Sequence, residues 1–179
     1  MSDGKKGVAR KVVIVDLSLR GGNGIDLIKE MKQRWPLMPA LVVSVHDEAF
    51  FAERVLKAGA RGYVTKGEPS QKVVDSIREV LNGGICVGEK VASQMIGLFV
   101  RGPGNDGSAR STMDELTDRE FEIFEMLGQG LGSRRIAERL GLSIKTVDSH
   151  RENIKKKLKL SGAAELLRHA IQWVQQGQV

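Results

Sequence analysis

The sequence has one cysteine, three histidines and no long apolar run, and each scarcity excludes a class of protein. Cys86 has no second cysteine with which to form an intramolecular disulfide, so we expect a reduced, partly buried thiol. His46, His150 and His169 show no metal-ligand spacing with one another or with Cys86, so no metal site of that kind is expected. No apolar run reaches the ~18 residues that a membrane-spanning helix needs.

The N-terminus also lacks the features of a secretory signal. Residues 1–6 are polar and lead into a short apolar run at 12–15, whereas a signal peptide needs a longer one. We therefore expect a cytoplasmic protein without a membrane partner. Hydrophobic residues make up 41% of the 179 residues, which suits the cores of one or two small domains and excludes a disordered chain.

The positive charge is concentrated in one segment. The chain carries a net charge of +6, and residues 133–159 alone hold nine Lys or Arg against three Asp or Glu. Residues 114–129 have the opposite balance, with Arg119 as the single cation among six acids. The basic segment is suited to phosphates, and the acidic segment is expected to face away from them.

A stretch rich in Gly, Ser and Asn at 101–112 divides the chain into two blocks and is typical of a flexible linker. In the N-terminal block, strand-like and helix-like segments alternate, and this order predicts a parallel sheet with right-handed crossovers. The predicted strands lie at 11–17, 40–45 and 62–65, and the predicted helices lie at 25–33, 49–58, 69–81 and 89–100.

The C-terminal block has no strand signal and predicts four helices, at about 117–128, 133–140, 144–158 and 163–175. Thr117 and Glu120 form a capping box for the first helix. Ser133 is expected to cap the second helix and Ser143 the third. Gly141 between them supplies the sharp turn of a helix-turn-helix.

The third of these helices has a narrow apolar stripe, predicted to dock on its neighbours, and a long polar face that fits the major groove of DNA. The stripe consists of Ile144, Val147, Ile154 and Leu158. The residues expected to read base edges are Lys145, Asp148, Ser149 and Glu152. The residues expected to contact phosphates are Arg134, Thr146, Arg151, Lys155 and Lys156. A merely solvated helix face is the alternative interpretation.

The uninterrupted string LTDREFEIFEMLGQGLGSRRIAERLGLSIKTVDSHRENIKKKLKL, at 116–160, resembles the NarL/LuxR-type helix-turn-helix. The resemblance implies a four-helix DNA-binding domain that dimerises through its last helix, here 163–174. Its apolar positions would be Leu166, Leu167, Ala170 and Val174, and Trp173 would take part in the core or the interface.

The N-terminal block resembles part of a response-regulator receiver domain, a flavodoxin-like (CheY-like) fold. The resemblance makes Asp16 the phosphoacceptor at a strand end, Ser44 and Lys66 its hydroxyl and ammonium partners, and Tyr63 the aromatic switch residue. A carboxylate nucleophile, a hydroxyl and an ammonium are the groups that phosphoryl transfer requires. A sensor histidine kinase is the partner that such a domain implies.

The block departs from the receiver pattern because only fifteen residues precede Asp16. The first two strands, the first helix and the acidic pair that binds Mg²⁺ would be absent, and Asp16 would be the only remaining metal ligand. We therefore expect absent or very slow phosphorylation and no bound cofactor, with Mg²⁺ bound only if the receiver site is completed. We also expect an exposed apolar sheet edge that pairs with another chain or aggregates.

These observations predict an α/β domain followed by an all-α domain: a truncated receiver at 1–88, a linker helix and flexible linker at 89–113, and a LuxR-type helix-turn-helix domain at 114–179. The predicted function is that of a sequence-specific transcription regulator of a two-component system, not an enzyme. It would bind double-stranded DNA as a homodimer. The alternative is an interaction protein that forms mixed dimers with a full-length regulator.

Overall fold

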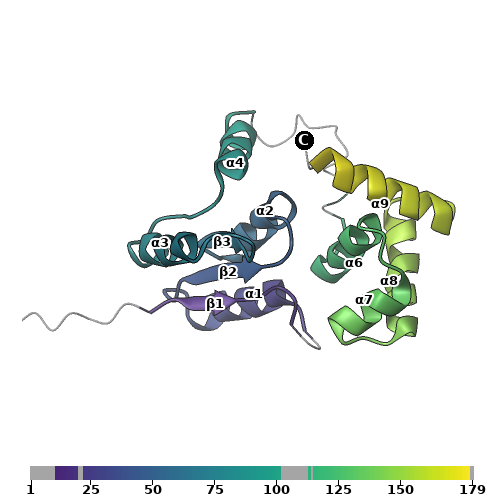
Figure 1. Ribbon diagram of the computed structural model, residues 1–179, viewed down its shortest axis with the longest axis horizontal. Coiled ribbons are helices and arrows are strands. Elements are labelled where there is room, and N and C mark those ends of the chain that lie inside the picture. Colours follow the sequence, from purple (N-terminus) through teal and green to yellow (C-terminus); the bar gives the residue numbers. More distant parts are fainter. Residues whose placement is uncertain (1–10, 20–21, 102–112, 114, 178–179) are drawn as a thin grey trace, which may run out of the picture.

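The computed structural model describes residues 11–19, 22–101, 113 and 115–177, which form two packed halves. The N-terminal half is a sheet with helices around it, and the C-terminal half is entirely helical (Figure 1). The predicted fold class, a partial receiver-like sheet followed by a helical domain, is confirmed. Most of the predicted flexible linker lies outside the described residues.

The sheet has three parallel strands in the order β1-β2-β3. They are β1 (Val13–Val15), β2 (Ala40–Ser44) and β3 (Gly62–Thr65). β2 lies in the middle and its residues are almost entirely buried, which explains its continuous apolar sequence. The predicted first strand, at 11–17, is longer than the three residues that pair.

Four helices belong to this half, and polar caps fix where two of them begin. Asn23 caps α1 (Gly24–Arg34) by accepting a hydrogen bond from the backbone N–H of Ile25. Asp47 caps α2 (Glu48–Ala58) in the same way. Two further helices follow β3, namely α3 (Ser70–Leu81) and α4 (Glu89–Arg101).

The two faces of the sheet are covered unequally. Side chains of α1 and α2 pack on the face that carries Val15 and Val42. The opposite face has a smaller apolar cluster, in which Val80 of α3 packs with Leu41, Val64 and Cys86. Cys86 is a free thiol and is buried more completely than expected. β1 is an edge strand and its Ile14 is 51% exposed, as the predicted apolar edge requires.

The C-terminal half consists of α6 (Asp118–Gly128), α7 (Ser133–Leu140), α8 (Ile144–Lys157) and α9 (Ala163–Gly177). These are the four predicted helices, with small shifts at their ends. The capping box of α6 is present, because Thr117 and Glu120 each accept a hydrogen bond from the other's backbone N–H.

The residue that precedes α7 differs from the prediction. Ser133 is the first helical residue, and the cap position is occupied by Gly132, which has no side chain to offer. The hydroxyl of Ser133 instead donates to Asp148 on α8, at 2.8 Å. The local sequence preference for a serine cap is therefore overridden by a contact between two helices.

The helix α6 lies on the side of the C-terminal half that faces the N-terminal half (Figure 1). Every residue of α6 from Glu120 to Leu127 is buried, although three of these residues are glutamates. One side of the helix packs against α8 and α9, and other residues contact the N-terminal half. One apolar cluster consequently runs through both halves.

Candidate functional site

The helix α8 is joined to α7 by a tight turn and held by an apolar stripe. Gly141 ends α7 with a left-handed backbone (φ 64°), a conformation that costs glycine little. Ser143 then caps α8 by accepting from the N–H of Thr146 at 3.0 Å. Val147 and Ile154 are fully buried against the neighbouring helices. This arrangement is a helix-turn-helix.

The apolar stripe is shorter than predicted. Leu158, just beyond the end of α8, is 7% exposed and belongs to the core, whereas Ile144 is 48% exposed. Ile144 is the first residue of α8, and the first buried residue of the helix is Val147. Three of the four predicted stripe residues therefore hold the helix in place.

The opposite side of α8 is exposed, as its predicted role requires. Lys145, Ser149, Glu152 and Lys156 are all exposed. The hydroxyl of Ser149 donates to the carbonyl of Lys145 at 2.9 Å, and Glu152 pairs with Lys155 at 2.8 Å. These contacts lie on the exposed surface of the helix, where a bound ligand can replace them.

Asp148, predicted as a base reader, already has partners within the protein. Its carboxylate accepts the hydroxyl of Ser133 at 2.8 Å and lies 3.7 Å from the guanidinium of Arg151. Arg151 in turn donates to the hydroxyl of Ser133 at 2.6 Å. The three side chains therefore form a network that joins α7 to α8.

The residues predicted to contact phosphates differ in how exposed their side chains are. Arg134 has a side chain 84% exposed and pairs with Glu138. The side chain of Lys155 is only 19% exposed, and that of Arg151 is 26% exposed. The hydroxyl of Thr146 forms a hydrogen bond with that of Ser143. Arg134 and Lys156 are thus the more accessible cations.

The receiver-like residues of the N-terminal half do not form one cluster. Lys66 donates to the carboxylate of Asp16 at 2.6 Å, which joins the ends of β3 and β1 as predicted. Ser44 is fully buried, and its oxygen accepts the backbone N–H of His46 at 3.3 Å. Tyr63 is also buried and donates to the carbonyl of His46 at 2.9 Å. Burial raises the pKa of the Tyr63 hydroxyl, so it stays protonated and donates.

His46 was not predicted as a functional residue. It is 4% exposed, and its ring lies between the end of β2 and the helix α6. The signal in the sequence was indirect: Glu122 and Glu125, three residues apart, share one side of an acidic helix and require a cation if they are buried.

The residues around Asp16 do not fit a divalent metal ion. One oxygen of Asp16 is held by Lys66, and the other accepts the backbone N–H of Ser18. Within the described ranges, no group of three His, Cys, Asp or Glu side chains is arranged to hold a metal. The Mg²⁺ site of a receiver is therefore not formed by these residues.

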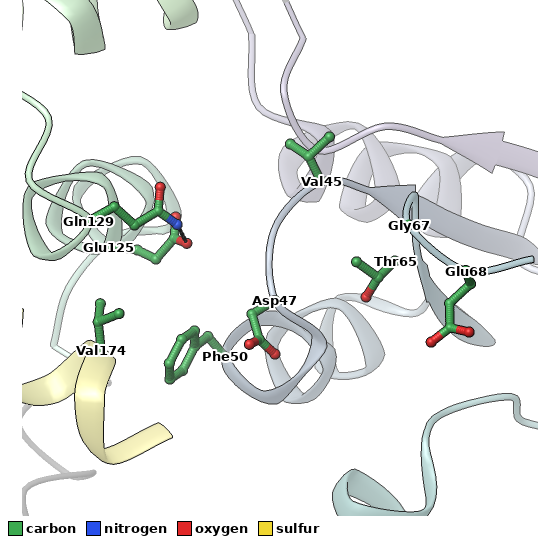
Figure 2. A pocket seen from close by; sticks show the side chains of 9 residues that line it. All are labelled: Val45, Asp47, Phe50, Thr65, Gly67, Glu68, Glu125, Gln129 and Val174. Atoms are coloured by element: carbon green, nitrogen blue, oxygen red, sulfur yellow. Dashed lines mark hydrogen bonds between the residues drawn. The ribbon is translucent and has the colours of Figure 1, made fainter. Parts of the chain in front are cut away.

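A cleft of about 440 Å³ lies where the two halves meet. Figure 2 shows Phe50 and Asp47 on one side, Glu125 and Gln129 on another, and Val174 below them. The amide of Gln129 donates to Glu125 along one side of this cleft. The cleft adjoins Thr65 and Gly67, which flank Lys66.

Comparison with known proteins agrees with this geometry. Residues 6–78 match the response regulator receiver domain, and residues 114–170 match the bacterial regulatory proteins of the luxR family. Oxygen regulatory protein NreC of Staphylococcus carnosus is 32% identical over 164 residues, which cover 89% of this chain and 75% of that protein. The chain belongs to the LuxR-type response regulators.

Further similar proteins include a second regulator and a solved structure. Transcriptional activator protein ExaE of Pseudomonas putida is 35% identical over 161 residues, covering 90% of this chain and 74% of that protein. RcsB from Salmonella enterica serovar Typhimurium, solved bound to promoter rprA, is 25% identical, with 89% of this chain and 74% of that chain covered and a TM-score of 0.48.

This LuxR-type response regulator is thus a DNA-binding transcription regulator of a two-component system, from a family of regulators rather than enzymes. Among the residues that the structure describes, no helix is both long and apolar enough to cross a membrane.

Proposed function

We propose that this regulator binds DNA with α8 in the major groove and reads base edges with Lys145, Ser149 and Glu152. The observation that supports the proposal is the division of α8 into two sides. Val147 and Ile154 anchor one side, and the exposed polar side chains lie on the other. A lysine donates to guanine acceptors, and a glutamate accepts from the cytosine amine.

The remaining predicted contacts take two roles in this proposal. Arg134, Thr146, Arg151, Lys155 and Lys156 contact phosphates, which sets the register of the helix on DNA rather than the sequence. Asp148 acts within the protein, because its hydrogen bond with Ser133 and its proximity to Arg151 fix α7 against α8. It is therefore a positioning residue rather than a base reader.

The test compares two lysines on the same helix, after selection of a preferred site from genomic fragments by gel shift. Lys145→Ala should lose roughly 1–3 kcal/mol at one base pair and relax the sequence preference there. Lys156→Ala should weaken binding to all sequences alike and reduce the salt slope by about one. Equal loss on all sequences for Lys145→Ala contradicts base reading. No binding at low salt contradicts the proposal and favours mixed dimers with a full-length regulator.

The homodimer is proposed to form through α9, with a subset of its predicted apolar positions. Leu166, Ala170 and Val174 are buried within the protein itself and therefore belong to its own core. Leu167 is 41% exposed and Ile171 is partly exposed one turn later. Leu167→Asp should therefore yield a monomer in sedimentation, while Gln172→Asp, an exposed control on α9, should not.

Phosphorylation of Asp16 is proposed to be absent or very slow, because among the described residues no group of three His, Cys, Asp or Glu side chains is arranged to hold the Mg²⁺ that phosphoryl transfer needs. The chain is incubated with acetyl phosphate and Mg²⁺, and its intact mass is measured. We expect no added phosphate. A gain of one phosphate that disappears in Asp16→Asn contradicts this proposal and restores a sensor histidine kinase as the partner.

A further inference from the structure

The acidic side of α6 is in contact with cations of the N-terminal half. Asp118 accepts from Lys29 at 2.6 Å and from Arg54 at 3.1 Å. Glu122 and Glu125, further along the helix, contact His46. The side of α6 that carries these acids therefore meets a complementary set of positive groups rather than solvent.

His46 is the most deeply buried of these cationic groups. Its Nδ1 lies 2.9 Å from Oε2 of Glu125. Its Nε2 lies 2.9 Å from the hydroxyl of Ser18 and 3.6 Å from Oε1 of Glu122. The ring is also tilted against that of Phe51, with centroids 4.7 Å apart. Both ring nitrogens are thus directed at acceptors, as in a protonated imidazole.

The backbone of His46 is held as firmly as its ring. Its N–H donates to Ser44, and its carbonyl accepts from Tyr63. The imidazole therefore contacts the carboxylates of α6 from a fixed position at the end of β2. The two carboxylates lie at different ring nitrogens, so the arrangement fits a proton at each nitrogen and not one shared metal ion.

The carboxylates that face His46 are buried almost completely, at 1% exposed for Glu122 and 0% for Glu125. Arg119 and the amide of Asn23 reach the second oxygen of Glu122. Its first oxygen, Oε1, has no hydrogen bond in the described structure and faces His46 alone. Without a cation at His46, Glu125 would lose its ion pair and Glu122 would depend on Arg119 for charge compensation, which is unfavourable for buried carboxylates.

We propose that the acidic side of α6 is a docking surface for the N-terminal half, and that the imidazolium of His46 is the cation that holds the two halves together. The ion pair of Lys29 with Asp118 contributes less, because the Lys29 side chain is half-exposed and solvent screens its charge. This proposal concerns the packing of the halves and does not depend on how α8 contacts DNA.

The charged groups around His46 determine how docking changes with pH. Burial opposes the charge, but the hydrogen bond to Glu125 and the nearby carboxylate of Glu122 outweigh burial and raise the pKa of His46 to about 9. Asp47 follows it in the chain, Arg119 faces it through Glu122, and Tyr63 is protonated. A raised pKa means that the stabilisation is complete below the ordinary histidine pKa of about 6.5 and is lost as pH rises through about 9.

Trp173 reports on docking, because its ring lies 4.2 Å from that of Phe50 in the N-terminal half. The experiment uses the full chain with Trp35→Phe, which removes the other, exposed tryptophan. Acrylamide quenching of Trp173 is measured from pH 6 to pH 10. We expect low quenching at neutral pH and a rise with a midpoint near 9.

Three variants in this background test the role of His46. His46→Gln should show the high quenching already at pH 7. The double variant Glu122→Gln, Glu125→Gln should move the midpoint down by ~1 pH unit or more, because it removes the charges that favour the imidazolium. Lys29→Ala should behave like the parent. Far-UV circular dichroism checks that each variant keeps its helices.

Two results with variants of the His46 site would overturn the proposal, and so would one result with Lys29→Ala. One is a His46→Gln variant that stays protected at pH 7 and keeps the same transition. The other is a Glu122→Gln, Glu125→Gln variant with an unchanged midpoint, and this remains informative even where His46→Gln fails to fold. Equal opening in Lys29→Ala would show that surface charge in general, rather than His46, holds the halves together.

Discussion

The candidate DNA-contacting side chains of the C-terminal half lie mostly on one helix, whereas the receiver-like residues of the N-terminal half come from the ends of three strands. Residues along α8 are held in register by its own backbone hydrogen bonds. Asp16, Ser44 and Lys66 depend on the pairing and neighbours of separate strands. In this molecule, Asp16 and Lys66 meet while Ser44 faces His46.

The two halves also differ in how completely they are packed. In the C-terminal half, each of the helices α6 to α9 contributes fully buried apolar side chains to the core. In the N-terminal half, the sheet keeps a half-exposed isoleucine on its edge strand, and Leu37 in a connecting turn is 95% exposed. Substitutions in the two halves should therefore have unequal costs.

The largest effect is expected in the core of the C-terminal half. Ile154→Ala removes a fully buried side chain from α8 and should lower the free energy of unfolding by about 2–5 kcal/mol. Ile144→Ala, on the same helix but half-exposed, should cost less than about 1 kcal/mol. Urea denaturation of both variants measures this difference, and equal costs would contradict the unequal burial of the two side chains.

A smaller loss is expected at the turn that follows Asp16. A Cβ on Gly24 would collide with the carbonyl oxygen of Asp16, so Gly24→Ala should destabilise the chain by about 1–3 kcal/mol. Gly67→Ala is the matched control, because a Cβ there meets nothing within 4 Å. If the two variants unfold at the same urea concentration, the turn is more adaptable than its close packing indicates.

Removal of one side chain of the α6 capping box should lower the stability of the protein moderately. Thr117→Ala removes the side-chain acceptor for the N–H of Glu120 and should cost about 1 kcal/mol. Thr117→Ser retains a hydroxyl and should recover most of that loss. The free energies of unfolding of the two variants show whether the hydroxyl stabilises the helix. If Thr117→Ser does not recover stability, the loss is due to the missing methyl group.

The smallest change is expected at the start of α7. Gly132 occupies the cap position without a side chain, and a Cβ there meets nothing within 4 Å. Gly132→Ser should therefore raise the free energy of unfolding by roughly a few tenths of a kcal/mol. A decrease would indicate that Ser133, already bonded to Asp148, is disturbed by the new hydroxyl.

The elements of both halves could be predicted from sequence because their signals are local. Apolar periodicity, the capping box and Gly141 each act within a few residues, and the helices they predicted are present. Ser133 and Ile144 were assigned wrongly for the same reason. Their positions depend on how one helix crosses another, which a pattern along a single helix does not contain.

The packing of the halves could not be predicted in this way. The acidic character of α6 was visible, and we expected that segment to face away from phosphates, but its partner remained unknown. His46 and Glu125 are 79 positions apart, and neither has a local motif that indicates the other. Only the fold shows that an acidic helix surface in one half covers a histidine in the other.

The aromatic cluster between the halves has a consequence for how the molecule melts. Trp173 contacts Phe50 of the N-terminal half as well as Phe121 and Phe124 of α6, and Phe51 contacts Phe121 edge to face. The halves thus share apolar surface that neither can bury alone. Calorimetry should accordingly record a single cooperative endotherm, with equal van't Hoff and calorimetric enthalpies, rather than two successive transitions.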